Sequence, residues 1–443
     1  IQYHRNMSIE RYGVKDSLDY IIYDKCWGKV KEGIEDNKLT INSDCIFKSG
    51  EFLKSMDEEL HSGSTTTLVD IDCDGLQDLL VGDVDYGDIF LLRNGGSKDD
   101  AMIVEVDTVF PSERERIKLY SNPAVYMIDV DGDGKEDMLV SANDGIAGKN
   151  ERRILYYRDT SEMCSKGYKL CDSMFLLRTM FDFGEGSYPV FYDYNGDGMK
   201  DIVIGNYGYY RSSYYYYGYL KSNFSSQLAL LENIGSKEMP IYKVKSYDWG
   251  GLSRKNYIGL YPTFGDIDGD GIDELVTGDI EGKLHLFKKG KDTTGVDIFI
   301  EGDSSILGWI DVGSNSTPEL VDIDGDGLLD ILCGNKAGVI YYYQNTGTRN
   351  NPNYKLVSSN YGKINVVDTM LSYYGYSAPR VYSDGNKLLL TVGSYSGAIY
   401  YFGNIKGDEG NDNLHWRRLY IEGNNNNVNV SMSLSDINSD GYL

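Results

Sequence analysis

The sequence predicts an all-β fold assembled from repeated units of four short antiparallel strands. One Asp-rich loop recurs along the 443 residues at intervals of roughly sixty. Alternating strand-type segments lie between Gly-containing turns, without helical stretches. Units of this kind cannot bury both faces alone and pack around an axis as the blades of a β-propeller. A row of β-sandwiches is the alternative, but it requires longer units.

Composition agrees with a turn-rich, strand-rich protein. The chain has Gly 51, aromatic residues 13% and Pro 8. Its net charge of -25 excludes nucleic acid and anionic membrane as good partners, because both need a basic surface. No segment reaches the roughly 18 to 20 apolar residues that span a bilayer, so no membrane insertion is expected.

The repeat starts define the expected domain organisation. They fall near residues 70, 129, 193, 266, 322, 383 and 436. We therefore expect a single propeller over residues 1–443 with seven blades, and eight as the alternative. Residues 1–25 would end a preceding blade, since IQYHRN resembles IYYYQN at 340–345, and residues 26–60 would form a connecting segment with outer strands. Both termini are expected to be cuts through a longer protein.

Each repeat has the same internal order of signals. A proline usually precedes the acidic loop, as at Pro262 and Pro318, and marks a strand start or edge because it lacks a ladder donor. An apolar run such as residues 331–333 follows the loop. A turn with glycine and an alternating strand such as residues 339–345 come next, which predicts antiparallel hairpins.

The loop at residues 322–330 has the chemistry of a calcium site. Asp322, Asp324 and Asp326 supply carboxylates at positions 1, 3 and 5, and Asp330 closes the shell at position 9. Gly at position 6 permits a sharp turn, and the carbonyl at position 7 adds a ligand. Hard oxygen donors around a flexible turn suit Ca²⁺ better than Mg²⁺. Position 12 is apolar and strand-like, so an EF-hand, which needs Glu there and a helix, is excluded.

Five complete loops predict about five Ca²⁺ sites, against the alternative of solvated Asp-Gly turns. Their candidate ligands are Asp70, Asp72, Asp74, Leu76 and Asp78; Asp129, Asp131, Asp133, Lys135 and Asp137; Asp193, Asn195, Asp197, Met199 and Asp201; Asp266, Asp268, Asp270, Ile272 and Glu274; Asp322, Asp324, Asp326, Leu328 and Asp330.

Three loops depart from the full pattern. Asn195 replaces a carboxylate in the third loop, which predicts weaker binding. A sixth loop, with Asp436, Asn438 and Asp440, stops before position 9 and is expected to be incomplete. Ser383 stands where a repeat at 383 should begin with Asp, which predicts a blade without metal.

The six cysteines permit two local disulfides. We expect Cys26 to pair with Cys45 and Cys164 with Cys171, and Cys73 and Cys333 to stay unpaired.

Other chemistry-bearing patterns are sparse. The four histidines lie far apart in sequence, and no Gly-x-Ser-x-Gly motif is present.

Residues 205–224 are dense in tyrosine. The candidate contact residues there are Tyr207, Tyr209, Tyr210, Tyr214, Tyr215, Tyr216, Tyr217 and Tyr219. The segment is either an exposed surface for sugars or aromatic partners, or a hairpin whose tyrosines stack on one another.

The spacing DxDxDGxxD before an apolar strand resembles the FG-GAP or VCBS repeat of integrin α-subunit propellers and many secreted bacterial proteins. Segments such as LYPTFGDIDGDGIDELVTGD also look like large surface proteins that Bacteroidetes export by type IX secretion. The resemblance implies an extracellular, calcium-loaded propeller whose C-terminal sorting domain lies outside this chain.

These observations predict a non-enzymatic, calcium-binding propeller of a secreted or cell-surface protein. It would act as a binding or adhesion scaffold toward a protein or glycan, or as one module among other subunits of an outer-surface complex. The alternative is a carbohydrate-active enzyme, a polysaccharide lyase or hydrolase with paired carboxylates on the same fold.

Overall fold

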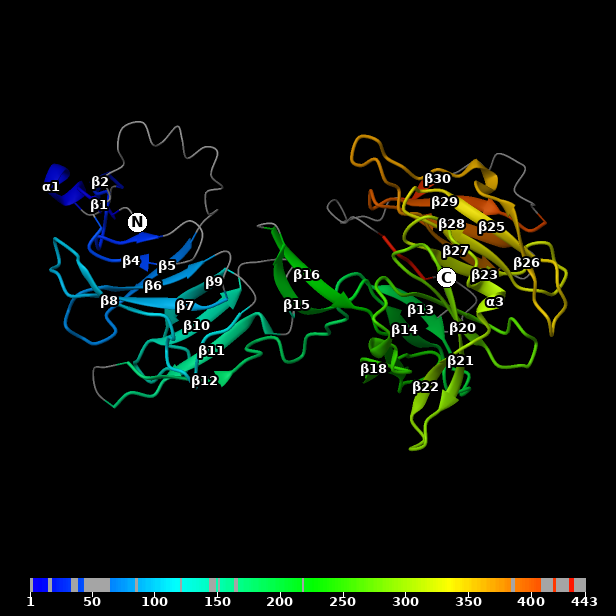
Figure 1. The fold of residues 1–443 in the computed structure, drawn as a ribbon, viewed down its shortest axis with the longest axis horizontal. Coiled ribbons are helices and arrows are strands. Elements are labelled where there is room, and N and C mark those ends of the chain that lie inside the picture. The colour runs from blue at the N-terminus through cyan, green and yellow to red at the C-terminus, as the bar shows by residue number, and fades with distance from the viewer. Residues whose placement is uncertain are drawn as a thin grey trace. The chain divides into compact units, whose positions relative to one another are not determined.

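The computed structural model describes residues 3–14, 18–32, 39–43, 64–83, 87–119, 122–142, 149, 152–162, 166–216, 219–383, 387–407, 417–419 and 430–433. Within these residues lie six four-stranded antiparallel sheets and three two-stranded ones (Figure 1). This confirms the predicted all-β fold of four-stranded blades. The number of blades in the whole protein stays a prediction.

One compact unit comprises residues 1–182 and 213–222. Its two blades are β5 (Ser64–Val69), β6 (Asp78–Asp83), β7 (Ile89–Asn94) and β8 (Ile103–Asp107), then β9 (Pro123–Ile128), β10 (Asp137–Ala142), β11 (Ile154–Asp159) and β12 (Tyr168–Asp172). Ahead of them, β1 (Tyr3–Asn6) pairs with β2 (Tyr20–Asp24) around helix α1 (Ser8–Tyr12), and β3 (Lys31–Glu32) pairs with β4 (Leu39–Thr40).

The other unit comprises residues 183–212 and 223–443. Its four blades are β13 (Tyr188–Tyr192), β14 (Asp201–Gly205), β17 (Ala229–Asn233) and β18 (Tyr242–Ser246); β19 (Tyr261–Gly265), β20 (Glu274–Gly278), β21 (Leu284–Lys291) and β22 (Asp297–Glu301); β23 (Thr317–Val321), β24 (Asp330–Gly334), β25 (Ile340–Asn345) and β26 (Tyr354–Ser358); β27 (Ala378–Ser383), β28 (Leu388–Gly393), β29 (Ile399–Asn404) and β30 (Arg417–Leu419). Short helical turns lie at η2 (Leu252–Lys255), α3 (Ser304–Leu307) and η3 (Tyr361–Lys363). Between β14 and β17 the chain forms a hairpin of β15 (Tyr209–Tyr216) and β16 (Tyr219–Ser225), of which residues 213–222 belong to the first unit.

Within each unit, the first strand of a blade is an edge strand that contacts the first strand of the next blade of that unit. In the second unit β13 contacts β19, β19 contacts β23 and β23 contacts β27; in the first unit β5 contacts β9. Pro262 and Pro318 lie on such strands, each paired with the second strand on one side only. An edge strand tolerates the missing N–H of proline, so the predicted role of these prolines is confirmed.

The cores lie between neighbouring blades. Ile331 and Cys333 of β24 pack with Val276 and Leu286 of the preceding blade. Leu332, one residue along, packs with the blade that follows. Because successive side chains point to opposite faces, a second strand covered on both faces is apolar throughout. This explains the continuous apolar runs after the acidic loops.

In the second unit a glycine ends the second strand of each described blade, because a neighbouring segment approaches too closely for a side chain. A Cβ on Gly278 would overlap the carbonyl oxygen of Ser316, and one on Gly334 would overlap that of Ser377. A Cβ on Gly393 would overlap the carbonyl oxygen of Val430 in the same way. Residues 430–433 therefore occupy the place where the first strand of a further blade would begin.

A buried ion pair joins two first strands of the second unit. Arg380 on β27 donates to the carboxylate of Glu319 on β23 at 2.8 Å and to the carbonyl of Met432 at 3.1 Å. Both side chains are almost fully buried. Removing one partner would leave an uncompensated buried charge, so this pair fixes the packing of the two blades.

The cysteines confirm part of the disulfide prediction. Cys26 is disulfide-bonded, and its expected partner Cys45 lies outside the described residues. Cys171 is a free cysteine held in strand β12, so the predicted pairing with Cys164, which also lies outside the described residues, is wrong. Cys333 is a buried thiol, as expected, and Cys73 is exposed in its acidic loop.

The single-propeller prediction and the assignment of residues 1–25 and 26–60 stay predictions. No helix among the described residues is long and apolar enough to span a membrane.

Candidate metal centres

Each acidic loop is shaped by hydrogen bonds from its own backbone to its carboxylates. In the loop between β23 and β24, Asp322 accepts the N–H of Gly325 at 2.7 Å and that of Gly327 at 2.9 Å. Asp326 accepts the N–H of Leu328 at 2.8 Å. Gly327 has a φ of 87°, a region that favours glycine. The sequence thus folds the loop tightly enough to gather its acids.

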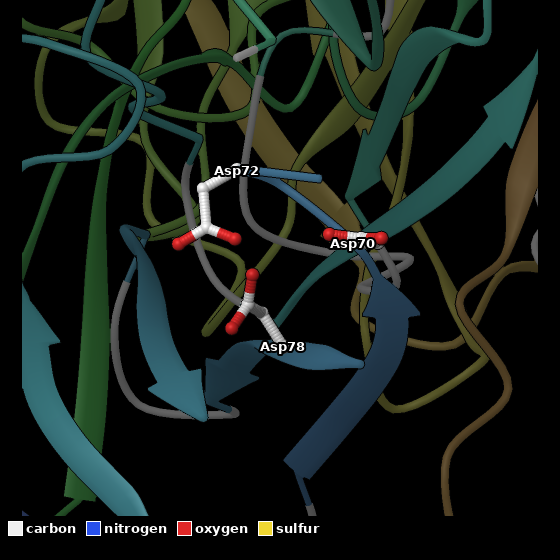
Figure 2. A group of neighbouring side chains, drawn as sticks. All are labelled: Asp70, Asp72 and Asp78. Atoms are coloured by element: carbon white, nitrogen blue, oxygen red, sulfur yellow. The ribbon is translucent and has the colours of Figure 1, made fainter. Parts of the chain in front are cut away.

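Carboxylates at positions 1, 3 and 9 converge in four loops. In each, one oxygen from each of three residues lies within 4.8 Å of the others. The groups are Asp70, Asp72 and Asp78; Asp129, Asp131 and Asp137; Asp266, Asp268 and Glu274; Asp322, Asp324 and Asp330. Figure 2 shows the first group, in which the three carboxylates face a common space.

Two oxygens in these groups have no partner of their own. Asp70 Oδ1 and Asp266 Oδ1 are buried and accept no hydrogen bond. A buried carboxylate oxygen without a partner is costly, and a hard divalent cation bound among these oxygens would remove that cost. The residues present therefore fit a metal ion.

The position 9 carboxylate is buried and anchors the loop to its blade. Asp330 accepts the N–H of Ile323 at 3.2 Å, the N–H of Asn345 at 2.8 Å and the hydroxyl of Tyr342 at 3.1 Å. The same arrangement recurs in three other loops. Their position 9 carboxylates accept one backbone N–H from the residue at position 2 and one from the last residue of the third strand; these carboxylates are Asp78, Asp137 and Asp201.

Burial of these carboxyls disfavours their charged form. It raises the pKa of Asp330 to about 6 and that of Glu274 to about 7. It also raises the pKa of Asp78 and of Asp201. A cation bound among these neighbouring carboxyls would therefore favour their charged form.

The remaining predicted ligands lie around these groups. The position 5 carboxylates, such as Asp74 and Asp270, accept the N–H of the residue at position 7. In the third loop, Asn195 donates to Asp197 at 2.9 Å, while Asp193 and Asp201 make the same backbone contacts as in the other loops. Ligation through the position 7 carbonyls stays a prediction. Asp436, Asn438 and Asp440 lie outside the described residues.

A residue on the third strand lies over each loop, and the sequence analysis missed it. Arg158 pairs with Asp131 at 2.6 Å and Asp133 at 3.3 Å, and Arg93 lies 3.6 Å from Asp72. The corresponding residues in the next three blades are Glu232, Lys288 and Gln344. For four of these five residues the available signal was their place directly before the last residue of the third strand; Lys288 lies further from the end of β21.

Lys288 is the strongest of these contacts. Its ammonium pairs with Asp268 and lies 3.5 Å from Asp270 and 3.8 Å from Glu274. A built-in cation thus already partly compensates this loop. Gln344, in contrast, donates one neutral hydrogen bond to Asp324 at 2.7 Å.

The tyrosine-dense segment forms a long hairpin. Tyr207 and Tyr210 pack edge-on against Phe224, with ring centroids 5.6 and 6.1 Å away. Tyr209 is half-buried, and Tyr214 and Tyr216 are exposed. The side chains of Tyr215, Tyr217 and Tyr219 lie outside the described part. Aromatic rings thus pack together at the base of the hairpin, and contact of the exposed tyrosines with a partner stays a prediction.

Comparison with known proteins locates a family signature within this geometry. A model described as FG-GAP-like repeat matches residues 266–333, from the fourth acidic loop into β24. No curated protein matches the chain.

Two solved structures are similar at low scores. A structure on recognition of non-reducing terminal N-acetylglucosamine by an Agrocybe aegerita lectin has a TM-score of 0.28 at 15% identity and covers 82% of each chain. A crystal structure of BBS1N in complex with ARL6DN, soaked with lead, has a TM-score of 0.18 at 12% identity, with 77% of this chain and 80% of that one covered. Structural similarity at these scores supports no functional assignment. From the repeat match and the observed blades, the chain carries an FG-GAP-like repeat on an all-β, propeller-type fold.

Proposed function

We propose that this chain is a calcium-stabilised, propeller-type binding module of a secreted or cell-surface protein. The convergence of three carboxylates in each of four loops is the observation that carries the proposal. Oxygen-only donor sets on flexible, Gly-containing turns favour Ca²⁺ over Mg²⁺, which demands a stricter octahedron. The family match at residues 266–333 supports the same reading.

Metal in these loops would act structurally. Each loop joins the first strand of a blade to the second, and position 9 begins the second strand in every loop described. An ion held between positions 1, 3 and 9 would therefore fix the loop to the blade. Rigid blades that present surfaces to a protein or glycan partner are the role we propose, without a catalytic step of their own.

Thermal unfolding with and without chelator tests the metal. Binding to the folded state alone adds about 4 kcal/mol per site at a thousandfold excess over Kd. We expect excess EDTA to lower the melting temperature by about 10 °C, and Ca²⁺, but not equal Mg²⁺, to restore it. An unchanged melting curve in EDTA would contradict the proposal.

A further inference from the structure

A cavity of about 340 Å³ lies in the second unit, where its first strands begin. Tyr188, Tyr261, Thr317 and Ala378 line it, and these are the first residues of β13, β19, β23 and β27. Acidic loops follow the other ends of β13, β19 and β23. The cavity is therefore distinct from the metal centres, and its volume lies in the range of small-molecule sites.

Tyrosine rings form much of the cavity wall. Tyr188 and Tyr261 are packed together, with ring centroids 4.9 Å apart. Tyr207 and Tyr376 line the cavity and are half-buried, so part of each ring is accessible. Flat apolar rings with a polar hydroxyl suit the face of a sugar ring, which is itself apolar with polar edges.

The buried ion pair contacts the cavity wall at Tyr261. The guanidinium of Arg380 lies 4.6 Å from the ring centroid of Tyr261, and Glu319 and the carbonyl of Met432 hold that guanidinium in place. The hydroxyls of Tyr261 and Ser431 are 2.9 Å apart. A wall fixed in this way loses little entropy when a ligand binds.

The polar lining of the cavity favours an anion. Asn315 and several serine and threonine residues line it, and so does Lys336. No Asp or Glu is among the described lining residues, although the chain carries a net charge of -25. The ammonium of Lys336 lies 4.3 Å from the ring centroid of Tyr374 and 5.8 Å from that of Tyr376, and no ion pair with a described carboxylate competes for it.

We propose that this cavity binds one acidic sugar ring, of the uronic acid class, at a terminus of a glycan. Tyr207 and Tyr376 would contact the ring faces, Asn315 would hydrogen-bond ring hydroxyls, and Lys336 would pair with the carboxylate. The assignment rests on the proposed role as a binding module and names its ligand class.

Titration of the Ca²⁺-loaded chain with methyl glucuronide, methyl glucoside and acetate tests this site by ligand-observed NMR. The carboxylate adds a charge-assisted contact, so we expect the glucuronide to bind about tenfold more tightly than the glucoside. Acetate, which lacks the ring, should bind no better than the glucoside. Equal binding of glucuronide and glucoside, or none of the glucuronide, would overturn the proposal.

Two variants separate the roles of charge and ring. Lys336→Met should abolish the preference for the glucuronide, and Tyr376→Ala should weaken both sugars. Lys355→Met, at an exposed position on β26, is the matched control and should bind as the parent does. Unchanged glucuronide binding in both Lys336→Met and Tyr376→Ala would overturn the assignment. The chelator melt uses no sugar and this titration uses no chelator, so failure of one proposal is distinguishable from failure of the other.

Discussion

The loops at residues 266–274 and 322–330 have four carboxylates in the same spacing, with Glu274 in place of Asp at position 9 of the former, and their surroundings differ. Lys288 places an ammonium among the acids of the loop at residues 266–274. Gln344, at the corresponding place in the next blade, offers only a neutral amide. Two unit charges 4 Å apart interact by about 1 to 4 kcal/mol between the limits of bulk water and a protein surface. The motif alone therefore does not set the affinity of a loop.

The anchoring of the ninth residue differs as well. Asp330 accepts three hydrogen bonds, from Ile323, Asn345 and Tyr342. Glu274 accepts one from the backbone, that of Ile267 at 3.1 Å. The loop at residues 266–274 is thus held partly by the ammonium of Lys288. The loop at residues 322–330 is held by neutral donors, and its ninth residue accepts more hydrogen bonds.

The largest expected effect is loss of the Asp330 carboxylate. Asp330→Ala leaves three donors without an acceptor in a buried place, and each such loss costs about 1 to 3 kcal/mol. In EDTA, where metal makes no contribution, denaturant unfolding should show a loss of about 3 kcal/mol or more. Glu274→Ala should cost less in the same assay, because it removes fewer hydrogen bonds. Equal losses would show that the anchoring does not differ.

Exchange of the third-strand residues should come next in size. Lys288→Gln removes the competing ammonium, so we expect Ca²⁺ affinity of that loop to rise about tenfold, a difference of about 1.4 kcal/mol. Gln344→Lys should lower the affinity of the other loop by a similar factor. Calorimetric Ca²⁺ titration measures both, with Lys355→Gln as an exposed control. Titration curves unchanged by either exchange would remove the role we give these residues.

The stability of the metal-free protein should also depend on pH. The usual pKa of these carboxyls is about 4, and burial raises it to about 6 for Asp330 and about 7 for Glu274. Above pH 4 the unfolded chain loses protons that the folded chain keeps, so stability falls as pH rises. The loss levels off about one pH unit above the pKa of Glu274. Unfolding in EDTA between pH 4.5 and 8 should show this decline, and saturating Ca²⁺ should reduce it; stability that rises over this range would contradict it.

The sequence predicted the repeated elements because their signals are local. The Asp spacing, the prolines of the first strands and the apolar runs each follow from one strand or loop, and β24 (Asp330–Gly334) lies where the apolar run predicts it. Contacts across strands were not predictable in this way. Lys288 reaches the acids through strand pairing, and the cavity draws on the starts of four strands. The cysteine prediction failed at Cys171 because proximity in sequence does not reveal that this residue lies within strand β12.

The smallest expected effect concerns the loop after Ser383. Ser383→Asp restores the first carboxylate, but we expect no new Ca²⁺ site and no change in melting temperature beyond about 1 °C, since surface substitutions shift stability by about 0.5 kcal/mol or less. The reason lies in the second strand. Ser383 pairs directly with Leu388, and the N–H of Leu388 donates to Asn404 at 2.8 Å. The loop after Ser383 is therefore shorter than the acidic loops. The side-chain amide of Asn404, on the third strand, accepts the N–H at the start of the second strand, whereas in the other blades a buried carboxylate begins that strand. Calorimetry that counts one more Ca²⁺ in this variant would show that the first carboxylate is sufficient and that the anchored ninth residue is not required.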